Sequence, residues 1–169
     1  MLSNPKKAAT RSRIKIGNIF EVELGDGTKK YFQYVANDLT QLNSRVIRAF
    51  KHAYNTDEEI DFNKMVKDKI EFYAHVFLPI GVKLGCWKKT GHVADVGRVD
   101  VYFRNSSDYG NPHVKRSDNW YVWKINEPFV DIGKLEGKYR EAEIGVVVSP
   151  HNIVHRIKTG KYDFVYPDY

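Results

Sequence analysis

The stretch Asn119-Trp-Tyr-Val-Trp-Lys-Ile-Asn126 carries the densest aromatic pattern in the chain. Successive side chains of a β-strand point to opposite faces, so Trp120 would lie on one face and Trp123 on the other. Large apolar groups on both faces are typical of a strand inside a sheet, with a strand on each side and packing on each face. We therefore expect a central strand here and a deeply buried Trp123.

Apolar segments elsewhere in the chain predict further strands and a few helices. Gly25-Asp26-Gly27 is typical of a hairpin turn, because these residues accept positive φ angles. Ser149-Pro150 has the composition of a helix start, and Gly160 that of a helix stop. The expected strands cover residues 14–16, 19–24, 31–35, 70–78, 96–103, 130–132, 143–148 and 162–166, and the expected helices run from Asp38 or Ser44 to Tyr54, from Thr56 to about Lys67, and from Ser149 to Gly160.

This balance of elements predicts an α+β protein that is mainly β. We expect a strongly bent, barrel-like antiparallel or mixed sheet with two or three peripheral helices. A chain of 169 residues fits one globular domain, which we place at residues 14–169. Residues 1–13 contain four basic residues, no acidic residue and no apolar periodicity, so we expect a mobile basic arm.

Much of the net charge of +6 lies in this arm. Its four basic residues leave only +2 for residues 14–169, which carry no lysine stripe of the kind that follows a nucleic-acid backbone. No apolar run approaches the roughly 20 residues that span a bilayer, and the single cysteine, Cys86, excludes an intrachain disulfide. We therefore expect a cytoplasmic protein without membrane association, whose oligomeric state stays open.

Each candidate catalytic or metal-binding group has a simpler structural explanation. His151 and His155 have the spacing of paired zinc ligands, but no Glu follows the first His and no third ligand is evident. Cys86 near His92 suggests a thiolate and its base, but its apolar neighbours favour an inert buried thiol. Glu136-Gly137-Lys138 imitates a nuclease motif but lies in a predicted turn. We expect no catalytic residue, no metal ion and no cofactor.

A long polar connection, residues 105–118, has aromatic side chains in it and beside it. Exposed aromatic and arginine side chains anchor many protein interfaces. The alternative is that these side chains only cover the core. The candidate partner-binding residues are Tyr109, His113, Arg116, Trp120 and Tyr121.

Four segments together resemble the immunity protein 26 family of bacterial polymorphic toxin systems: Ile16–Val22, Asp38–Phe50, Cys86–Lys89 and Trp120–Asn126. The resemblance extends over about residues 14–166. It implies a small, mainly β, non-enzymatic cytoplasmic protein that binds and neutralises a cognate toxin domain. The family's Gly-Asp step is Gly17-Asn18 here, and because Asn keeps the turn-forming capacity without the charge, we expect that position to be structural.

Two other classes of function stay open. A nucleic-acid-binding β module would use the basic arm and the exposed aromatic side chains. An enzyme would have to use His75, Cys86 or His92. For an immunity protein, the mildly basic charge of residues 14–169 predicts either an acidic toxin or local charge complementarity.

Overall fold

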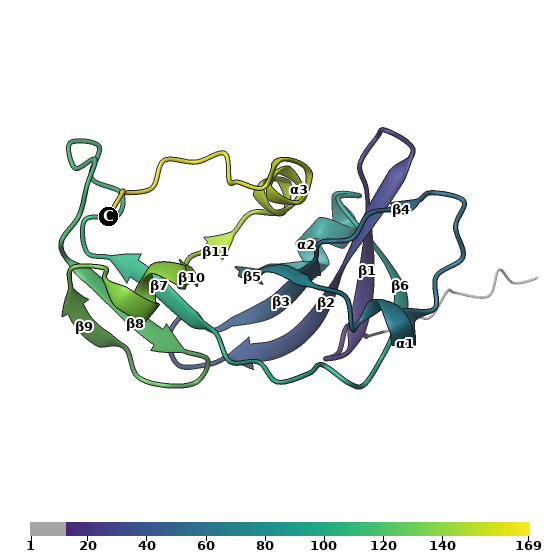
Figure 1. The fold of residues 1–169 in the computed structure, drawn as a ribbon, viewed down its shortest axis with the longest axis horizontal. Helices are drawn as coiled ribbons and strands as arrows, with labels where there is room; N and C mark the ends of the chain where they lie inside the picture. The colour runs from purple at the N-terminus through teal and green to yellow at the C-terminus, as the bar shows by residue number, and fades with distance from the viewer. Residues whose placement is uncertain (1–12) are drawn as a thin grey trace, which may run out of the picture.

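The computed structural model describes residues 13–169, which form two β-sheets with three α-helices around them (Figure 1). The predicted basic arm, residues 1–13, lies almost entirely outside the described residues. The strands are β1 (Asn18–Glu23), β2 (Thr28–Asp38), β3 (Ser44–Phe50), β4 (Tyr54–Asn55), β5 (Ile70–Val76), β6 (Lys88–His92), β7 (Tyr102–Ser106), β8 (Trp120–Lys124), β9 (Val130–Gly133), β10 (Glu143–Ile144) and β11 (Val147–Val148). The helices are α1 (Phe62–Met65), α2 (Leu78–Lys83) and α3 (Pro150–Thr159), with a 3-10 helix, η1 (Gly137–Glu141).

The larger sheet is built around β2 and β3. Its strand order is β11-β5-β3-β2-β1-β6, and β4 pairs with one end of β2. Neighbouring strands are antiparallel except β11, which runs parallel to β5. The hairpin between β1 and β2 confirms the predicted turn, in which Gly25 has a φ of +86° and Gly27 of +87°. The expected strand at 70–78 is likewise confirmed as β5.

The smaller sheet has the order β10-β7-β8-β9 and places the predicted aromatic strand inside it. β8 pairs antiparallel with β7 on one side and β9 on the other. Trp120 packs on one face of this sheet with Val122 and Leu135, whereas Trp123 packs on the other face and is only 2% exposed. The predictions of a central strand and of a buried Trp123 are confirmed.

Helices cover the larger sheet. Ile153 and Ile157 of α3, each at most 2% exposed, pack against sheet residues that include Phe72. Residues of α1 pack against the opposite face. The predicted ends of α3 are confirmed, because Ser149 caps its first turn and Gly160 ends it in the left-handed conformation, with a φ of +84°.

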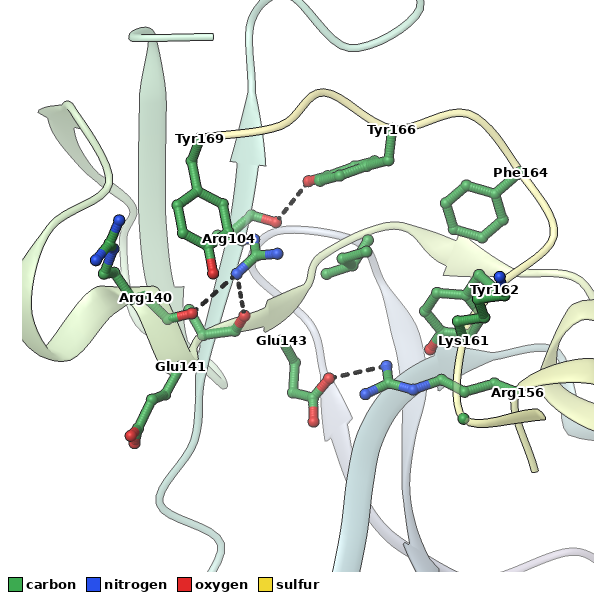
Figure 2. Close-up of a pocket in the computed structure, with 13 residues that line it drawn as sticks. Arg104, Arg140, Glu141, Glu143, Arg156, Lys161, Tyr162, Phe164, Tyr166 and Tyr169 are labelled. Atoms are coloured by element: carbon green, nitrogen blue, oxygen red, sulfur yellow. Dashed lines mark hydrogen bonds and ion pairs between the residues drawn. The ribbon is translucent and has the colours of Figure 1, made fainter. Parts of the chain in front are cut away.

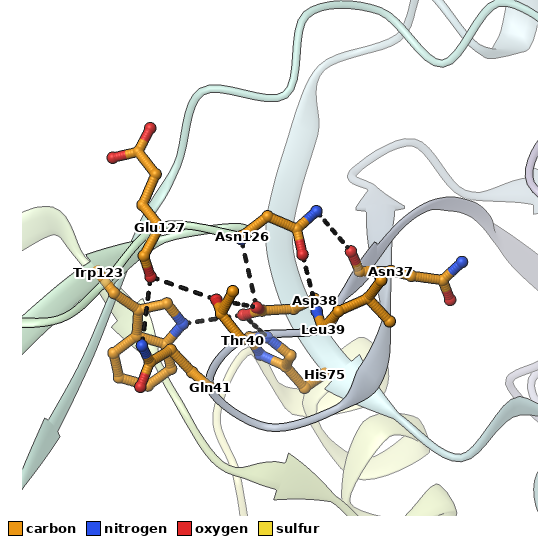
Figure 3. Close-up of polar contacts among 9 residues, drawn as sticks. All are labelled: Asn37, Asp38, Leu39, Thr40, Gln41, His75, Trp123, Asn126 and Glu127. Carbon is orange, nitrogen blue, oxygen red and sulfur yellow. Dashed lines mark hydrogen bonds and ion pairs between the residues drawn. The ribbon is translucent and has the colours of Figure 1, made fainter.

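A buried carboxylate joins the two sheets (Figure 3). Asp38, at the end of β2, is 0% exposed and accepts hydrogen bonds from Trp123 Nε1 of β8 and from His75 Nε2 of β5, both at 2.9 Å. Its other oxygen accepts from the Asn126 backbone N–H and the Thr40 hydroxyl, both at 3.3 Å. Burial raises the pKa of Asp38, but the bonds from His75 and Trp123 outweigh it and hold that pKa below its usual value. Burial lowers the pKa of His75, so a neutral imidazole faces a carboxylate.

The prediction of a helix ending at Tyr54 is wrong, because residues Ser44–Phe50 form β3. This strand lies between β2 and β5 and is covered on both faces, so that Val46 is 0% exposed and even Arg48 is only 5% exposed. The Arg48 guanidinium donates to the side-chain oxygen of Gln33 at 3.0 and 2.7 Å. Burial on both faces removes the alternation that identifies a strand and leaves an apolar run that also fits a helix.

The helix expected to begin at Thr56 is reduced to α1, which Asp61 caps. The amino group of Lys29, a residue only 7% exposed, donates to the backbone carbonyl oxygens of Thr56 and Glu58, each at 3.0 Å. A buried lysine of β2 thus binds two carbonyl groups that a helix would have used. The helix is capped by the Asp61 carboxylate, which accepts from the Asn63 and Lys64 N–H groups, and it does not begin at Thr56.

The single strand expected at residues 143–148 is divided between the two sheets. β10 runs parallel to β7 of the smaller sheet, and β11 runs parallel to β5 of the larger one. Gly145 lies between them, and a Cβ there would be 2.1 Å from the Trp123 ring. Glycine therefore lets the chain cross between the sheets directly against the indole.

Other segments also differ from expectation. The strand expected at 96–103 begins only at Tyr102. Residues 14–16 and 162–166 lie outside every strand, although the expected short strand at 130–132 is confirmed as β9. In the 162–166 segment the aromatic residues are half-buried and Val165 is 91% exposed. The alternation there reflects packing of aromatic rings without a hydrogen-bonded ladder.

The fold is α+β and mainly β, with mixed sheets and peripheral helices, as the sequence predicts. The larger sheet is open, since its path ends at β11 on one side and at β6 on the other. Among residues 13–169, no helix has both the length and the apolar character needed to cross a bilayer.

Candidate functional site

An open cleft of about 430 Å³ lies beside the C-terminal segment, residues 160–169, which runs from the end of α3 to the smaller sheet (Figure 2). We call it the basic cleft. Ligand sites in proteins have volumes of roughly 300–1,000 Å³, so the cleft is large enough for a small molecule or a few side chains of a partner. Its lining includes two acidic side chains and four aromatic ones, and its cations are Arg104, Arg140, Arg156 and Lys161.

The C-terminal segment is fixed across the cleft by hydrogen bonds. The Tyr166 hydroxyl donates to the Arg104 carbonyl at 3.0 Å. Further along, the Asp168 N–H donates to the Lys115 carbonyl at 2.8 Å, and the Asp168 carbonyl accepts from the Ser117 N–H at 2.9 Å. The aromatic residues of this segment therefore form a wall of the cleft.

Arg104 of β7 has no carboxylate in direct contact, although Glu143 interacts with it electrostatically from further away. Its Nη1 donates to the carbonyl oxygens of Arg140 at 3.2 Å and of Ala142 at 2.9 Å. Its buried Nε has no hydrogen-bond partner, and within residues 13–169 no acidic oxygen lies within 4.0 Å of the guanidinium. Backbone carbonyls hold the side chain in place without neutralising it.

The guanidinium groups of Arg104 and Arg140 both lie against the ring of Tyr169. The centre of the Arg104 guanidinium is 4.9 Å from the Tyr169 ring centroid, and that of Arg140 is 5.4 Å away. The ring lies between the two cations in Figure 2. Arg140 is exposed and, like Arg104, has no ion pair among the described residues. Cation–π attraction stabilises both arginines but leaves their charges available.

On the other side of the cleft, Arg156 is paired with a carboxylate. Arg156 Nη1 lies 2.9 Å from Glu143 Oε2, and the same guanidinium is 4.7 Å from the centroid of the Tyr162 ring. Burial raises the pKa of Glu143, and Arg156 opposes the rise. Burial likewise raises the pKa of Tyr162 to about 12, so this phenol stays protonated. Among the described residues, Arg156 is the cleft cation that forms an ion pair, so the unpaired positive charges of the cleft lie at Arg104, Arg140 and Lys161.

The predicted loop residues lie next to this cleft. Tyr109 is 42% exposed, and its ring centroid is 5.2 Å from that of Tyr166. His113 and Arg116 are exposed. The loop is ordered by its own hydrogen bonds, in which the Asp108 carboxylate accepts from Ser117 at 2.6 Å and from Asn119 at 3.0 Å. The role of Tyr109, His113 and Arg116 in partner binding stays a prediction.

The two predicted site residues of β8 are less accessible. Trp120 is only 1% exposed, and its Nε1 donates to the Ser117 carbonyl at 2.7 Å, so it belongs to the core. Its indole is 5.7 Å from the Arg104 guanidinium and supports the cleft from behind. Tyr121 is half-buried and contacts Phe129 at a centroid distance of 5.2 Å.

The groups considered for catalysis are not assembled into a site. Cys86 Sγ lies 3.8 Å from His151 Nδ1 instead of near His92, and burial raises the pKa of the thiol, which disfavours a thiolate. His75 is fully buried against Asp38. Among residues 13–169, no group of three His, Cys, Asp or Glu side chains is arranged to hold a metal ion.

The Gly17-Asn18 step has the structural role expected of it. Gly17 adopts a φ of +93°, and a Cβ there would lie 2.6 Å from the Val93 carbonyl oxygen. Asn18 is 3% exposed, and its side-chain oxygen accepts from the Lys15 N–H at 2.8 Å.

Sequence reasoning missed the cleft. Its parts come from β7, from η1 and β10, from α3 and from the C-terminal segment, and no local motif joins them. Comparison of the chain with protein-family models, with curated proteins and with solved structures gave no match. The resemblance to the immunity protein 26 family therefore stays a prediction, and the function has to be argued from the site.

Proposed function

We propose that this protein is a non-enzymatic, cytoplasmic immunity protein that binds and neutralises a cognate bacterial toxin domain. The observation that carries the proposal is the ordered loop of residues 107–118, which exposes Tyr109, His113 and Arg116 on a backbone fixed by its own hydrogen bonds. A surface that is already ordered loses little conformational entropy on binding. Aromatic and arginine side chains on such a surface are typical interface anchors.

The test is protection of cells that express the toxin encoded by the neighbouring open reading frame, together with titration of the purified proteins. We expect truncation of Tyr109, His113 or Arg116 to alanine to leave the melting temperature nearly unchanged. Loss of an anchor should weaken toxin binding by about 2 kcal/mol or more, roughly thirtyfold in Kd. Arg98→Ala is a matched control, because its side chain is 89% exposed and lies in another loop.

Two outcomes would contradict parts of this proposal. Full protection and unchanged affinity in every loop variant would place the interface elsewhere. The double variant Cys86→Ser with His151→Gln should protect fully, because no thiolate chemistry is required of this pair. Loss of protection by this variant in a folded state would support the enzyme hypothesis.

A second candidate function is binding of single-stranded nucleic acid. The basic cleft favours it, since arginine and tyrosine side chains are the residues that such grooves combine. An affinity for oligonucleotides that falls steeply with salt would support this function. A chain that protects against the toxin without binding oligonucleotides would exclude it.

A further inference from the structure

We infer that the basic cleft is the receptor for a carboxylate-bearing segment of the partner protein, with Arg104 and Arg140 as the groups that bind the acid. This inference rests on the proposed function and names the chemistry of the partner. The loop with Tyr109 and the cleft are continuous through the contact between Tyr109 and Tyr166. One partner surface can therefore cover both.

The charge distribution selects an anion. Arg104 and Arg140 converge on the two sides of the Tyr169 ring, and neither has an ion pair among the described residues. The two like charges repel each other, and an anion beside them would relieve that repulsion. Glu143 acts on Arg104 only from a distance, because its direct ion pair is with Arg156.

The aromatic packing favours a carboxylate over a nucleotide. A bound base would need an open ring face on which to stack. Tyr169 has a guanidinium on each side, and Tyr162 is stacked on Phe164 at 4.9 Å with Arg156 also against its ring. The cleft offers cations and hydroxyl groups, while the faces of Tyr162 and Tyr169 are occupied. An acidic side chain of a protein meets these conditions with its planar oxygen pair.

Binding of an acidic segment of the partner also accounts for the net positive charge of residues 14–169. Residues 14–169 are mildly basic, which does not suit long-range attraction of a strongly basic toxin. An acidic segment seated in the cleft would provide complementarity at this one surface. Aspartate and glutamate side chains of the partner would approach Arg140 first, because it is exposed, and then the half-buried Arg104.

The experiment measures fluorescence anisotropy of a labelled hexaglutamate peptide with the full chain. Arg140→Gln should weaken binding about fivefold or more with little change in the melting temperature, because it keeps the backbone carbonyl that binds Arg104 and loses only an exposed cation–π contact with Tyr169. Arg104→Lys should weaken binding at least as much, since lysine lacks the planar fork. Arg98→Gln removes an exposed arginine that does not line the cleft, and this variant should bind the peptide as the wild type does.

Two further probes separate the sources of negative charge. Inorganic phosphate and a ten-nucleotide oligothymidylate are titrated against the same variants. The inference is overturned if the peptide shows no binding, if Arg140→Gln binds it as well as the wild type, or if the oligonucleotide binds more tightly than the peptide and loses affinity in Arg140→Gln. Protection by Arg140→Gln at wild-type level would also overturn it. Failure of the wild-type chain to protect, with peptide binding intact, would instead reject the proposed function.

Discussion

Replacing Asp38 by asparagine tests the contact that holds the two sheets together. The substitution keeps the shape of the side chain but changes one acceptor oxygen into an NH₂ donor. Asp38 Oδ2 accepts from both Trp123 and His75, and Oδ1 accepts from Asn126 and Thr40. Whichever way the amide is turned, at least one buried N–H group then faces another donor.

The cost follows from these bonds. Two bonds to a charged acceptor become bonds to a neutral one, which loses about 1 kcal/mol each, and one orphaned N–H adds about 1–3 kcal/mol. The carboxylate no longer has to be buried as a charge, which offsets part of the loss. We expect Asp38→Asn to lower the free energy of unfolding by about 3 kcal/mol. For a chain of this size that corresponds to a fall in Tm of roughly 6–12 °C.

Thermal unfolding followed by circular dichroism, with urea titration at pH 7.5, measures the effect. Asp100→Asn is the control, because Asp100 is half-exposed and pairs with Lys124 at the surface at 2.6 Å. Its effect should stay within about 0.5 kcal/mol. A Tm of Asp38→Asn equal to that of the control would refute the reasoning that this carboxylate joins the sheets.

Two further predictions concern the same junction. Because burial lowers the pKa of His75, the unfolded chain binds a proton near pH 6.5 that the folded chain does not, so stability should fall as the pH drops below about 6.5. His75→Gln should show a smaller fall in urea midpoint between pH 7.5 and 5.5, and an equal fall in both proteins would contradict this assignment. Gly145→Ala places a Cβ 2.1 Å from the Trp123 ring and should cost about 3 kcal/mol through overpacking. An unchanged Tm for Gly145→Ala would show that the chain moves aside freely.

Elements with local signals were predicted well from the sequence. The hairpin at residues 25–27 needs only its own glycines, and α3 needs only Ser149 and Gly160 at its ends. β8 was recognised because Trp120 and Trp123 mark both of its faces. In each of these elements the deciding residues lie within the element itself.

Elements that depend on distant partners were not predicted. β3 resembles a helix in sequence because both of its faces are buried: Ile47 packs in the core cluster that includes α3, and Val46 packs in the cluster that includes Trp123 of the smaller sheet. Arg48 is accommodated inside it only because Gln33, fifteen positions earlier, supplies an acceptor. Lys29 determines the conformation near Thr56 in the same way. From the local sequence, Arg48 and Lys29 would be expected at the surface, because the partners that allow their burial are distant in the chain.

The basic cleft is formed by residues that are distant in the sequence, and it also depends on the junction between the two sheets. Arg104 lies on the smaller sheet, whereas Arg156 lies on α3, which packs on the larger sheet. Their separation is therefore set by how the sheets meet, and the bond from Trp123 to Asp38 is one of the contacts that fix it. A carboxylate site needs its cations held in one arrangement to avoid an entropic cost on binding. Weakening of this junction in Asp38→Asn should thus reduce the affinity for the hexaglutamate peptide even at temperatures where the variant is fully folded.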